Sequence, residues 1–478
     1  MRLPILLLLA ALATSCDGVS IAPFALEPCH IDGLGEEIRC GVREVLEDRD
    51  GQAGRRISIH IAVLPALRRI VERDPLFLLA GGPGQGAREL AQVVARYFRA
   101  VRRHRDVVLV DFRGTGASNP LKCDLPDDEL RVLEADDFEG QAERCAAALP
   151  ADPRFYTHHQ SLADLDDIRR DLGYDRINVW GGSWGTRAAL LYALRYPGST
   201  RTVILDGAAP LTLAFPSTVS ADAQAALDLL IKSCTEDAAC RSAFPDPRAE
   251  ISALDRRFVN DAVTVSIRHP RTHQPADVTL ARGIVFDMIR GALYVPRDAA
   301  SVLALVRAAA NGDFGPLAAQ HLRTASMTTD SMTPGATFAV LCSEDLPAVS
   351  GRDFQRDAGG SLFGTAYADV WRSRCRSWPK GRPLAEPMDA VSQTPALILS
   401  GTHDPVTPPR TGEMMSRHFA RFRHVVVPAA AHNASFTGCV PELIAGFIAQ
   451  GHGDTIDASC ASETAWPPFV IDIAGSRP

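Results

Sequence analysis

The five residues from Gly181 to Gly185, Gly-Gly-Ser-Trp-Gly, constrain the fold of this chain more than any other stretch. Residues 177–180 before them (Ile-Asn-Val-Trp) are typical of a buried strand, and residues 186–195 after them carry apolar side chains at helical spacing. A strand that enters a helix through a tight glycine turn places Ser183 at the helix N-terminus, where backbone N–H groups can meet negative charge. Because short G-x-S-x-G matches also arise by chance, a plain glycine turn is an equal alternative for the motif alone.

An acid and a histidine follow the serine in an order that hydrolytic chemistry uses. The predicted strand at residues 394–400 runs into a loop with Asp404, and the predicted strand at residues 423–428 runs into a loop with His432. An aspartate just past the carboxyl end of a parallel strand lies where open α/β sheets gather reactive groups. We expect His432 to take the proton from Ser183, while Asp404 fixes the imidazole tautomer and stabilises its charged form.

Asp206 is an alternative to Asp404 as the acid, because it ends the predicted strand at residues 202–205. Some related folds take their acid from that earlier strand, but the order serine, acid, histidine favours Asp404. We expect His403 to be an ordinary loop residue, since adjacent positions cannot both point into one site. A small-residue loop surrounds His432, which argues against a histidine packed in the core.

The first half of the chain contains a second glycine-rich loop. Residues 80–86 (Ala-Gly-Gly-Pro-Gly-Gln-Gly) directly follow a predicted buried strand at residues 76–79. Glycines let the backbone approach a ligand closely and turn an N–H group towards it. An oxyanion hole needs two such donors, and we expect them from Trp184, after the serine, and from Gly82. The loop by itself is equally compatible with a plain turn.

Taken together, the motifs resemble the proline iminopeptidase and tripeptidyl aminopeptidase branch of the α/β-hydrolases. That branch shows H-G-G-P-G, D-x-R-G-x-G-x-S, G-G-S-W-G, an aspartate loop of the D-x-x-T type and a histidine loop, in this order. The resemblance spans residues 55–211 and 393–450, and Ala80 stands where the branch usually has histidine. The matching positions are residues 81–84, 111–118 and 181–185, Asp404 with Thr407, and His432.

The resemblance implies an α/β-hydrolase fold, with a mostly parallel sheet flanked by helices, and a serine aminopeptidase that works through an acyl-enzyme. No cofactor is expected. Arg113, in the second motif, is expected to be a structural loop residue. A carboxylesterase or lipase with the same triad is the alternative. A non-catalytic surface lipoprotein that keeps the fold for binding is disfavoured by the complete triad.

The 478 residues exceed a single compact core, so an inserted lobe is expected. Between Pro210 and Pro395 the pattern is mostly helical, because residues 221–234, 300–311 and 314–322 carry spaced apolar residues without strand alternation. Isoleucine and valine alternate over residues 55–64 and predict an edge or early antiparallel strand. The expected parts are a signal peptide (1–15), an N-terminal extension (16–54), the hydrolase core (55–211 and 388–450), a helical cap over the active site (212–387) and a tail (451–478).

The N-terminus resembles an export signal. Residues 3–13 are an apolar run that is too short to span a bilayer and is typical of a signal peptide. Residues 13–16 (Ala-Thr-Ser-Cys) resemble a lipoprotein cleavage box, in which Cys16 would be lipidated, and ordinary cleavage after Ser15 is the alternative. We therefore expect the protein in the periplasm or cell envelope, attached to the membrane through Cys16.

Eleven cysteines make an odd set, and removing Cys16 leaves ten. In an oxidising compartment these ten fall into neighbouring pairs. The spacings do not resemble a zinc ribbon, so no metal site is expected. The expected disulfides are Cys29–Cys40, Cys123–Cys145, Cys234–Cys240, Cys342–Cys375 and Cys439–Cys460.

The charge of the chain and two of its acidic residues indicate which molecules it can bind. The net charge of −7 offers no electrostatic footprint for nucleic acid. One basic cluster is interpreted as the solvated face of a helix: Arg96, Arg99, Arg102, Arg103 and Arg105. An aminopeptidase must recognise a free ammonium group, and Glu344 and Asp345 are the best candidates in the cap. They follow Cys342, whose disulfide would hold their backbone, although a solvated acidic turn is an equal alternative.

Overall fold

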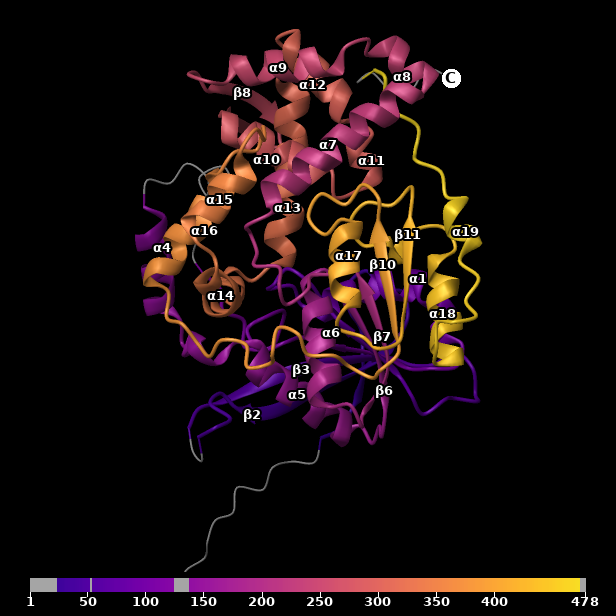
Figure 1. The fold of residues 1–478 in the computed structure, drawn as a ribbon. Helices are drawn as coiled ribbons and strands as arrows, with labels where there is room; N and C mark the ends of the chain where they lie inside the picture. The colour runs from indigo at the N-terminus through magenta and orange to yellow at the C-terminus, as the bar shows by residue number, and fades with distance from the viewer. Residues whose placement is uncertain (1–23, 52–53, 124–136, 473–478) are drawn as a thin grey trace, which may run out of the picture.

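The computed structural model describes residues 24–51, 54–123 and 137–472, and the expected signal peptide and Cys16 lie outside the described residues. A nine-stranded sheet forms its centre, in the order β1-β2-β3-β5-β4-β6-β7-β10-β11 (Figure 1). The antiparallel side consists of β1 (Glu27–Cys29), β2 (Ile38–Leu46) and β3 (Arg56–Leu64). The parallel strands are β4 (Leu76–Leu79), β5 (Val107–Val110), β6 (Ile177–Gly182), β7 (Thr200–Asp206), β10 (Ala396–Gly401) and β11 (Phe422–Val427).

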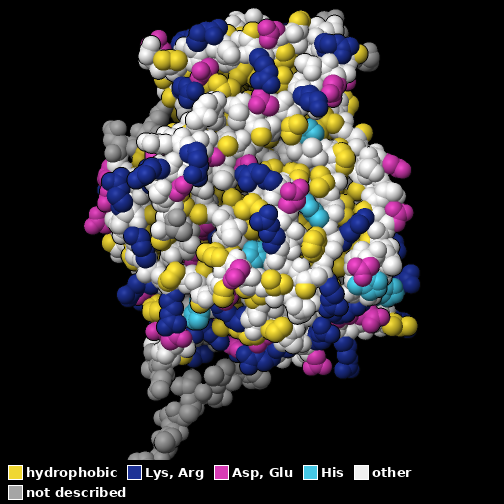
Figure 2. Space-filling view, in the orientation of Figure 1, with side chains coloured by type: hydrophobic (Ala, Val, Ile, Leu, Met, Phe, Trp, Pro, Cys, Tyr) yellow, Lys and Arg dark blue, Asp and Glu magenta, His cyan; other side chains and the backbone are white. Residues whose placement is uncertain are grey.

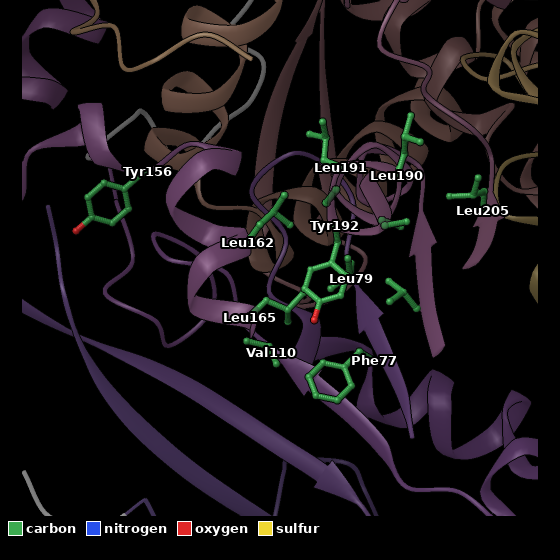
Figure 3. Close-up of a cluster of buried hydrophobic side chains, with 14 of the residues drawn as sticks. Phe77, Leu79, Val110, Tyr156, Leu162, Leu165, Leu190, Leu191, Tyr192 and Leu205 are labelled. Carbon is green, nitrogen blue, oxygen red and sulfur yellow. The ribbon is translucent and has the colours of Figure 1, made fainter. Parts of the chain in front are cut away.

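The parallel strands are short apolar runs because helices cover both faces of the sheet. The helices α4 (Phe138–Ala148), α5 (His158–Asp171) and α6 (Trp184–Arg195) pack on one face, with the hydrophobic cluster beneath them. Figure 3 shows Leu162 and Leu165 of α5 and Tyr192 of α6 gathered around Phe77 and Leu79 of β4. The helices α1 (Ala91–Tyr97), α2 (Arg99–Arg102) and α18 (Val440–Gln450) cover the other face. This mostly parallel sheet between helices confirms the predicted fold class.

An insertion between β7 and β10 forms a lobe above the carboxyl ends of the strands (Figure 1). A hydrophobic cluster of its own holds the upper helices together. Two helices in the second half of the insertion, α14 (Pro334–Val340) and α16 (Ala366–Ser377), pack instead on the core. Their contacts are Phe338 of α14, Cys375 of α16 and Trp378 directly after α16. The helices of the lobe are α7 (Val219–Glu236), α8 (Ala238–Ala243), α9 (Pro247–Arg257), α10 (Arg282–Ala292), α11 (Pro296–Ala299), α12 (Val302–Ala310), α13 (Gly315–Ser331), α14 (Pro334–Val340), the π-helical turn η3 (Leu341–Asp345), α15 (Gly351–Ala358) and α16 (Ala366–Ser377).

The lobe also contains a two-stranded hairpin, which was not predicted. The strands β8 (Val263–Arg268) and β9 (Pro275–Leu280) pair antiparallel. Alternation of valine and isoleucine with threonine and serine over residues 263–267 carries the signal in the sequence.

The C-terminal segment joins the core to the lobe. After α19 (Ser459–Ser462), the ring of Trp466 lies 4.2 Å from the ring of His403, which precedes Asp404. Further on, the N–H group of Val470 donates to the carbonyl oxygen of Ala300 at 3.0 Å. The chain beyond α18 therefore contacts both the loop after β10 and the cluster of the lobe.

Five disulfides join the pairs that the sequence suggested: Cys29–Cys40, Cys123–Cys145, Cys234–Cys240, Cys342–Cys375 and Cys439–Cys460. Across the described part of the chain, no helix is both long enough and apolar enough to cross a membrane.

The basic cluster near α2 is not a purely solvated face. Arg102 is 2% exposed and makes a two-pronged ion pair with Glu36, at 2.6 and 2.9 Å. Arg105 pairs with Asp74 at 3.1 Å. These arginines are bound to carboxylates by tertiary contacts that residue spacing does not reveal. Arg113 is also structural, because its buried guanidinium pairs with Asp164 at 2.7 Å.

Candidate active site

Ser183 lies in a tight turn between β6 and α6. Its backbone has φ 53° and ψ −120°, a conformation that costs free energy in a residue other than glycine. A Cβ atom at Gly181 would lie 2.2 Å from the carbonyl oxygen of Gly185, and one at Gly185 would lie 2.2 Å from that of Leu79. Because only glycine fits at both positions, the turn packs tightly against β4 and holds the serine in its strained conformation.

His432 and Asp404 lie together in the loops after β11 and β10. Nδ1 of His432 is 2.8 Å from Oδ2 of Asp404. The carboxylate also accepts hydrogen bonds from the N–H groups of Val406 and Thr407, at 2.9 and 2.8 Å, and from the hydroxyl of Thr407 at 2.8 Å. These donors hold the carboxylate in the orientation that binds the imidazole.

The charges of the pair stabilise each other in a buried environment. Burial acts to raise the pKa of Asp404, but His432 and the backbone donors outweigh it, and the pKa is lowered. Burial acts to lower the pKa of His432, but the neighbouring Asp404 carboxylate raises it above the ordinary value of 6.5. The site therefore favours an ionised aspartate beside a histidine that readily accepts a proton.

Asp206 has a different position. Its fully buried carboxylate accepts hydrogen bonds from the N–H groups of Ala434 and Ser435, at 2.7 and 2.9 Å. Its backbone oxygen accepts the N–H of Ser183 at 2.7 Å. Burial raises the pKa of Asp206 to about 6. Asp206 therefore connects the loop after His432 to the turn at Ser183 by hydrogen bonds, whereas Asp404 makes the hydrogen bond to the imidazole.

The glycine loop after β4 lies directly against the serine turn. A Cβ atom at Gly81 would lie 3.1 Å from Cβ of Ser183 and 3.6 Å from the backbone nitrogen of Trp184. Gly82 follows with φ 108°, which favours glycine. Trp184 is the first residue of α6, so its N–H has no acceptor within the helix. The two expected donor residues thus come from segments that meet at Ser183.

Glu344 and Asp345 are buried in η3 and do not form a solvated acidic turn. The oxygens of Glu344 contact His158, with 2.9 Å to its backbone nitrogen and 2.5 Å to Nδ1. Oδ1 of Asp345 accepts hydrogen bonds from Arg187 and from the backbone N–H of Phe215, both at 3.0 Å. Oδ2 of Asp345 is buried without a hydrogen-bond partner, and burial raises the pKa of this carboxyl to about 6.

Both partners of the acids lie against the ring of Trp184, the residue after the serine. The guanidinium of Arg187 is 4.0 Å from the ring centroid, and the ring of His158 stacks at 6.1 Å. These contacts were not predicted from the sequence, although an arginine four residues after the serine, in the buried first turns of a mainly apolar helix, is an unusual feature. The acidic pair is therefore connected through His158 and Arg187 to Trp184, the residue after the serine.

The described residues were also compared with the requirements of a metal site. Nowhere in the described ranges do three or more histidine, cysteine, aspartate or glutamate side chains lie so that they could hold a metal ion.

Comparison with known families agrees with this architecture. Residues 74–243 match the family described as alpha/beta hydrolase fold, and residues 360–460 match the family described as TAP-like protein. Together with the order of the sheet, these matches show that the chain has the α/β-hydrolase fold.

Several relatives of this chain are peptidases by name. It is 27% identical over 468 residues to serine protease Hip1 of Mycobacterium tuberculosis (strain ATCC 25618 / H37Rv), covering 88% of this chain and 87% of the relative. It is 24% identical over 476 residues to the tripeptidyl aminopeptidase of Streptomyces coelicolor, covering 91% and 85%. A probable proline iminopeptidase of Streptomyces coelicolor is 32% identical over 135 residues, covering 28% and 33%. The predicted branch is confirmed, and these relatives support a serine peptidase.

Proposed function

We propose that this α/β-hydrolase is an exported aminopeptidase that releases N-terminal residues or short peptides through an acyl-enzyme on Ser183. The observation that carries the proposal is the buried acidic pair next to Trp184. Oδ2 of Asp345 lacks a partner there, and an ammonium group is the natural ligand for a buried carboxylate oxygen. The names of the peptidase relatives, a serine protease and a tripeptidyl aminopeptidase, favour peptides as the substrate class.

In the first step Oγ of Ser183 attacks the scissile carbonyl carbon, and Nε2 of His432 takes the hydroxyl proton. Asp404 holds Nδ1–H and stabilises the imidazolium. The N–H groups of Trp184 and Gly82 bind the oxyanion of the tetrahedral intermediate. The C–N bond then breaks, and His432 passes its proton to the leaving amine.

The second step releases the N-terminal fragment. His432 removes a proton from water, the hydroxide attacks the acyl-enzyme, and the C–O bond to Ser183 breaks as His432 returns the proton to Oγ. Each oxyanion donor of this kind contributes about 10²–10³ in turnover.

Of the two acids, Asp345 has the more available acceptor. The Glu344 carboxylate is occupied by His158, whereas Oδ1 of Asp345 is occupied by Arg187 and Phe215 and Oδ2 is free. We therefore assign the contact with the substrate ammonium to Asp345, and Glu344 supports it by holding His158 against Trp184. The distance from this carboxylate to the scissile bond sets how many residues fit before the cut.

The test is a panel of amino-acyl and tripeptidyl anilides with free or acetylated N-termini, run beside p-nitrophenyl esters. Losing a buried charged contact costs about 2–5 kcal/mol, so acetylation is expected to lower kcat/KM by about 30- to 5,000-fold. Asp345→Asn should remove most of that discrimination, and Glu236→Gln, an exposed acid on α7, should leave it unchanged. If acetylated peptides or simple esters are cleaved as well as free peptides, the carboxylesterase alternative takes the place of the aminopeptidase.

We also propose that the protein is anchored in the cell envelope through a lipid on Cys16. Five disulfides favour an oxidising compartment. Fractionation of the expressing bacterium tests the anchor. The parent chain is expected with the membranes and Cys16→Ala in the soluble periplasmic fraction, and equal distribution of both would contradict lipidation.

A further inference from the structure

Tyr294 is a residue of the inserted lobe that contacts His432. It lies two residues after the end of α10, in the turn before α11. Its carbonyl oxygen accepts the backbone N–H of His432 at 3.2 Å. Its ring centroid lies 5.0 Å from that of the imidazole, with the planes at 70°. Figure 1 shows α11 above the upper ends of β10 and β11, which agrees with these contacts.

Other residues of the lobe hold the side chain of Tyr294 in place. Nη1 of Arg290, one helical turn earlier, donates to the hydroxyl of Tyr294 at 3.2 Å. Arg290 pairs with Asp287 at 2.7 Å and lies 4.5 Å from the centroid of the Tyr367 ring. A cavity of about 380 Å³ adjoins Arg290, Asp287 and Tyr367 between α7, α10 and α16. The lobe therefore fixes the hydroxyl of Tyr294 through Arg290, and it holds the backbone through the N–H of Tyr294, which donates to the carbonyl oxygen of Gly291 at 3.3 Å.

One hydrogen bond does not define the orientation of an imidazole. The contact with Asp404 fixes Nδ1, but the ring can still tilt about that hydrogen bond. The edge-to-face contact with Tyr294 restricts the tilt, and the backbone hydrogen bond restricts the loop that carries His432. The groups that face the imidazole are Asp404 with Thr407 after β10, Asp206 at the end of β7, and Tyr294 in the turn between α10 and α11.

We propose that Tyr294 is a positioning residue, through which the inserted lobe orients His432 towards Ser183 and shields its ring from water. The proposal rests on the proposed role of His432 as the base. It assigns the lobe a part in proton transfer in addition to substrate selection.

The test measures how fast a fluorophosphonate labels Ser183 in the full chain, because labelling needs the oriented histidine but no peptide recognition. Tyr294→Phe keeps the ring and the backbone contact, so its rate is expected to stay within about threefold of the parent. Tyr294→Leu should lower the rate at least about tenfold. The pH midpoint of the acid limb of labelling distinguishes positioning from a general loss of structure. Water admitted to the imidazole relieves the burial that lowers the pKa of His432, so this midpoint is expected to move up.

Phe314→Leu is the matched control, since it removes a ring from another aromatic pair of the lobe, Phe258 with Phe314 at 5.7 Å. It should leave the rate and the pH midpoint of labelling unchanged. If Tyr294→Leu labels like the parent, or slows by the same factor as Phe314→Leu with no shift of the midpoint, the proposal is wrong. Should Tyr294→Leu fail to fold, Tyr294→Met is measured against the same criteria. Failure of Ser183 to label in the parent would instead reject the proposed function.

Discussion

Oδ2 of Asp404 lies 2.8 Å from Nδ1 of His432. The carboxylate of Asp206, which is equally buried, instead accepts hydrogen bonds from backbone N–H groups of the loop that follows His432. Two aspartates at the ends of neighbouring strands thus have different tasks. Asp404 makes Nδ1 the protonated nitrogen and leaves Nε2 free to accept a proton. Asp206 stabilises the loop.

Exchanging each aspartate for asparagine separates these tasks. Asp404→Asn is expected to lower kcat by about 10⁴, because the amide no longer selects the reactive tautomer, with little loss of stability. Asp206→Asn should lower the free energy of unfolding by about 1–3 kcal/mol, because two buried N–H groups lose their charged acceptor. Urea unfolding and turnover of both purified variants check this. If Asp206→Asn lost turnover and Asp404→Asn lost only stability, Asp206 would be the acid of the triad.

The pKa of His432 predicts the pH profile. Catalysis needs the neutral imidazole, so kcat/KM falls as pH drops through the pKa of His432, which Asp404 holds above 6.5. The midpoint of the acid limb is therefore expected above pH 6.5, measured at constant ionic strength. By linkage, the protonated histidine stabilises the fold below pH 6.5, and this contribution disappears as pH rises through the raised pKa. A midpoint below 6.5 would mean that burial outweighs the aspartate.

Close packing of the serine turn makes Gly185 intolerant of a side chain. In Gly185→Ala the new Cβ would meet the Leu79 carbonyl oxygen at 2.2 Å, so the free energy of unfolding should fall by about 3 kcal/mol and activity should be lost. Gly446→Ala, in α18 with open space around the new Cβ, is the control and should stabilise by about 0.5–1 kcal/mol. Equal tolerance of both changes would show that the turn does not pack against β4.

The Cys342–Cys375 disulfide anchors the turn that carries Glu344 and Asp345. Replacing both cysteines with serine should lower the free energy of unfolding by about 3–4 kcal/mol and raise KM for free-N-terminal peptides, because η3 loosens. The Cys234–Cys240 pair joins α7 to α8 across a sequence separation of only 6, so its removal should cost about 2 kcal/mol and leave KM unchanged. Unchanged KM in both variants would argue against a substrate-binding role for η3.

The fold was largely predictable because its signals are local. Buried parallel strands appear as short apolar runs, and the elbow at Ser183 has a glycine pattern that only close packing explains. The order of Asp404 and His432 then follows from the positions of two strand ends. The β8–β9 hairpin was missed because its alternation is brief and lies between helices.

The surroundings of the site were less predictable because they depend on tertiary contacts. Spacing marks Glu344 and Asp345 as acids in one segment but does not reveal that His158 and Arg187 occupy them. Arg102 belongs to a basic stretch of sequence, yet its partner Glu36 lies 66 residues away. Tyr294 meets His432 only because the lobe closes over the strand ends.

Labelling with a fluorophosphonate followed by intact-mass and peptide mass spectrometry tests the central claim, that Ser183 is the nucleophile activated by His432. The account predicts one adduct on the parent chain, located on the peptide that contains Ser183, no adduct on Ser183→Ala, and no turnover by His432→Ala, since the unassisted hydroxyl is a weak nucleophile. A persistent adduct on Ser183→Ala, or an adduct on another residue of the parent, would contradict it.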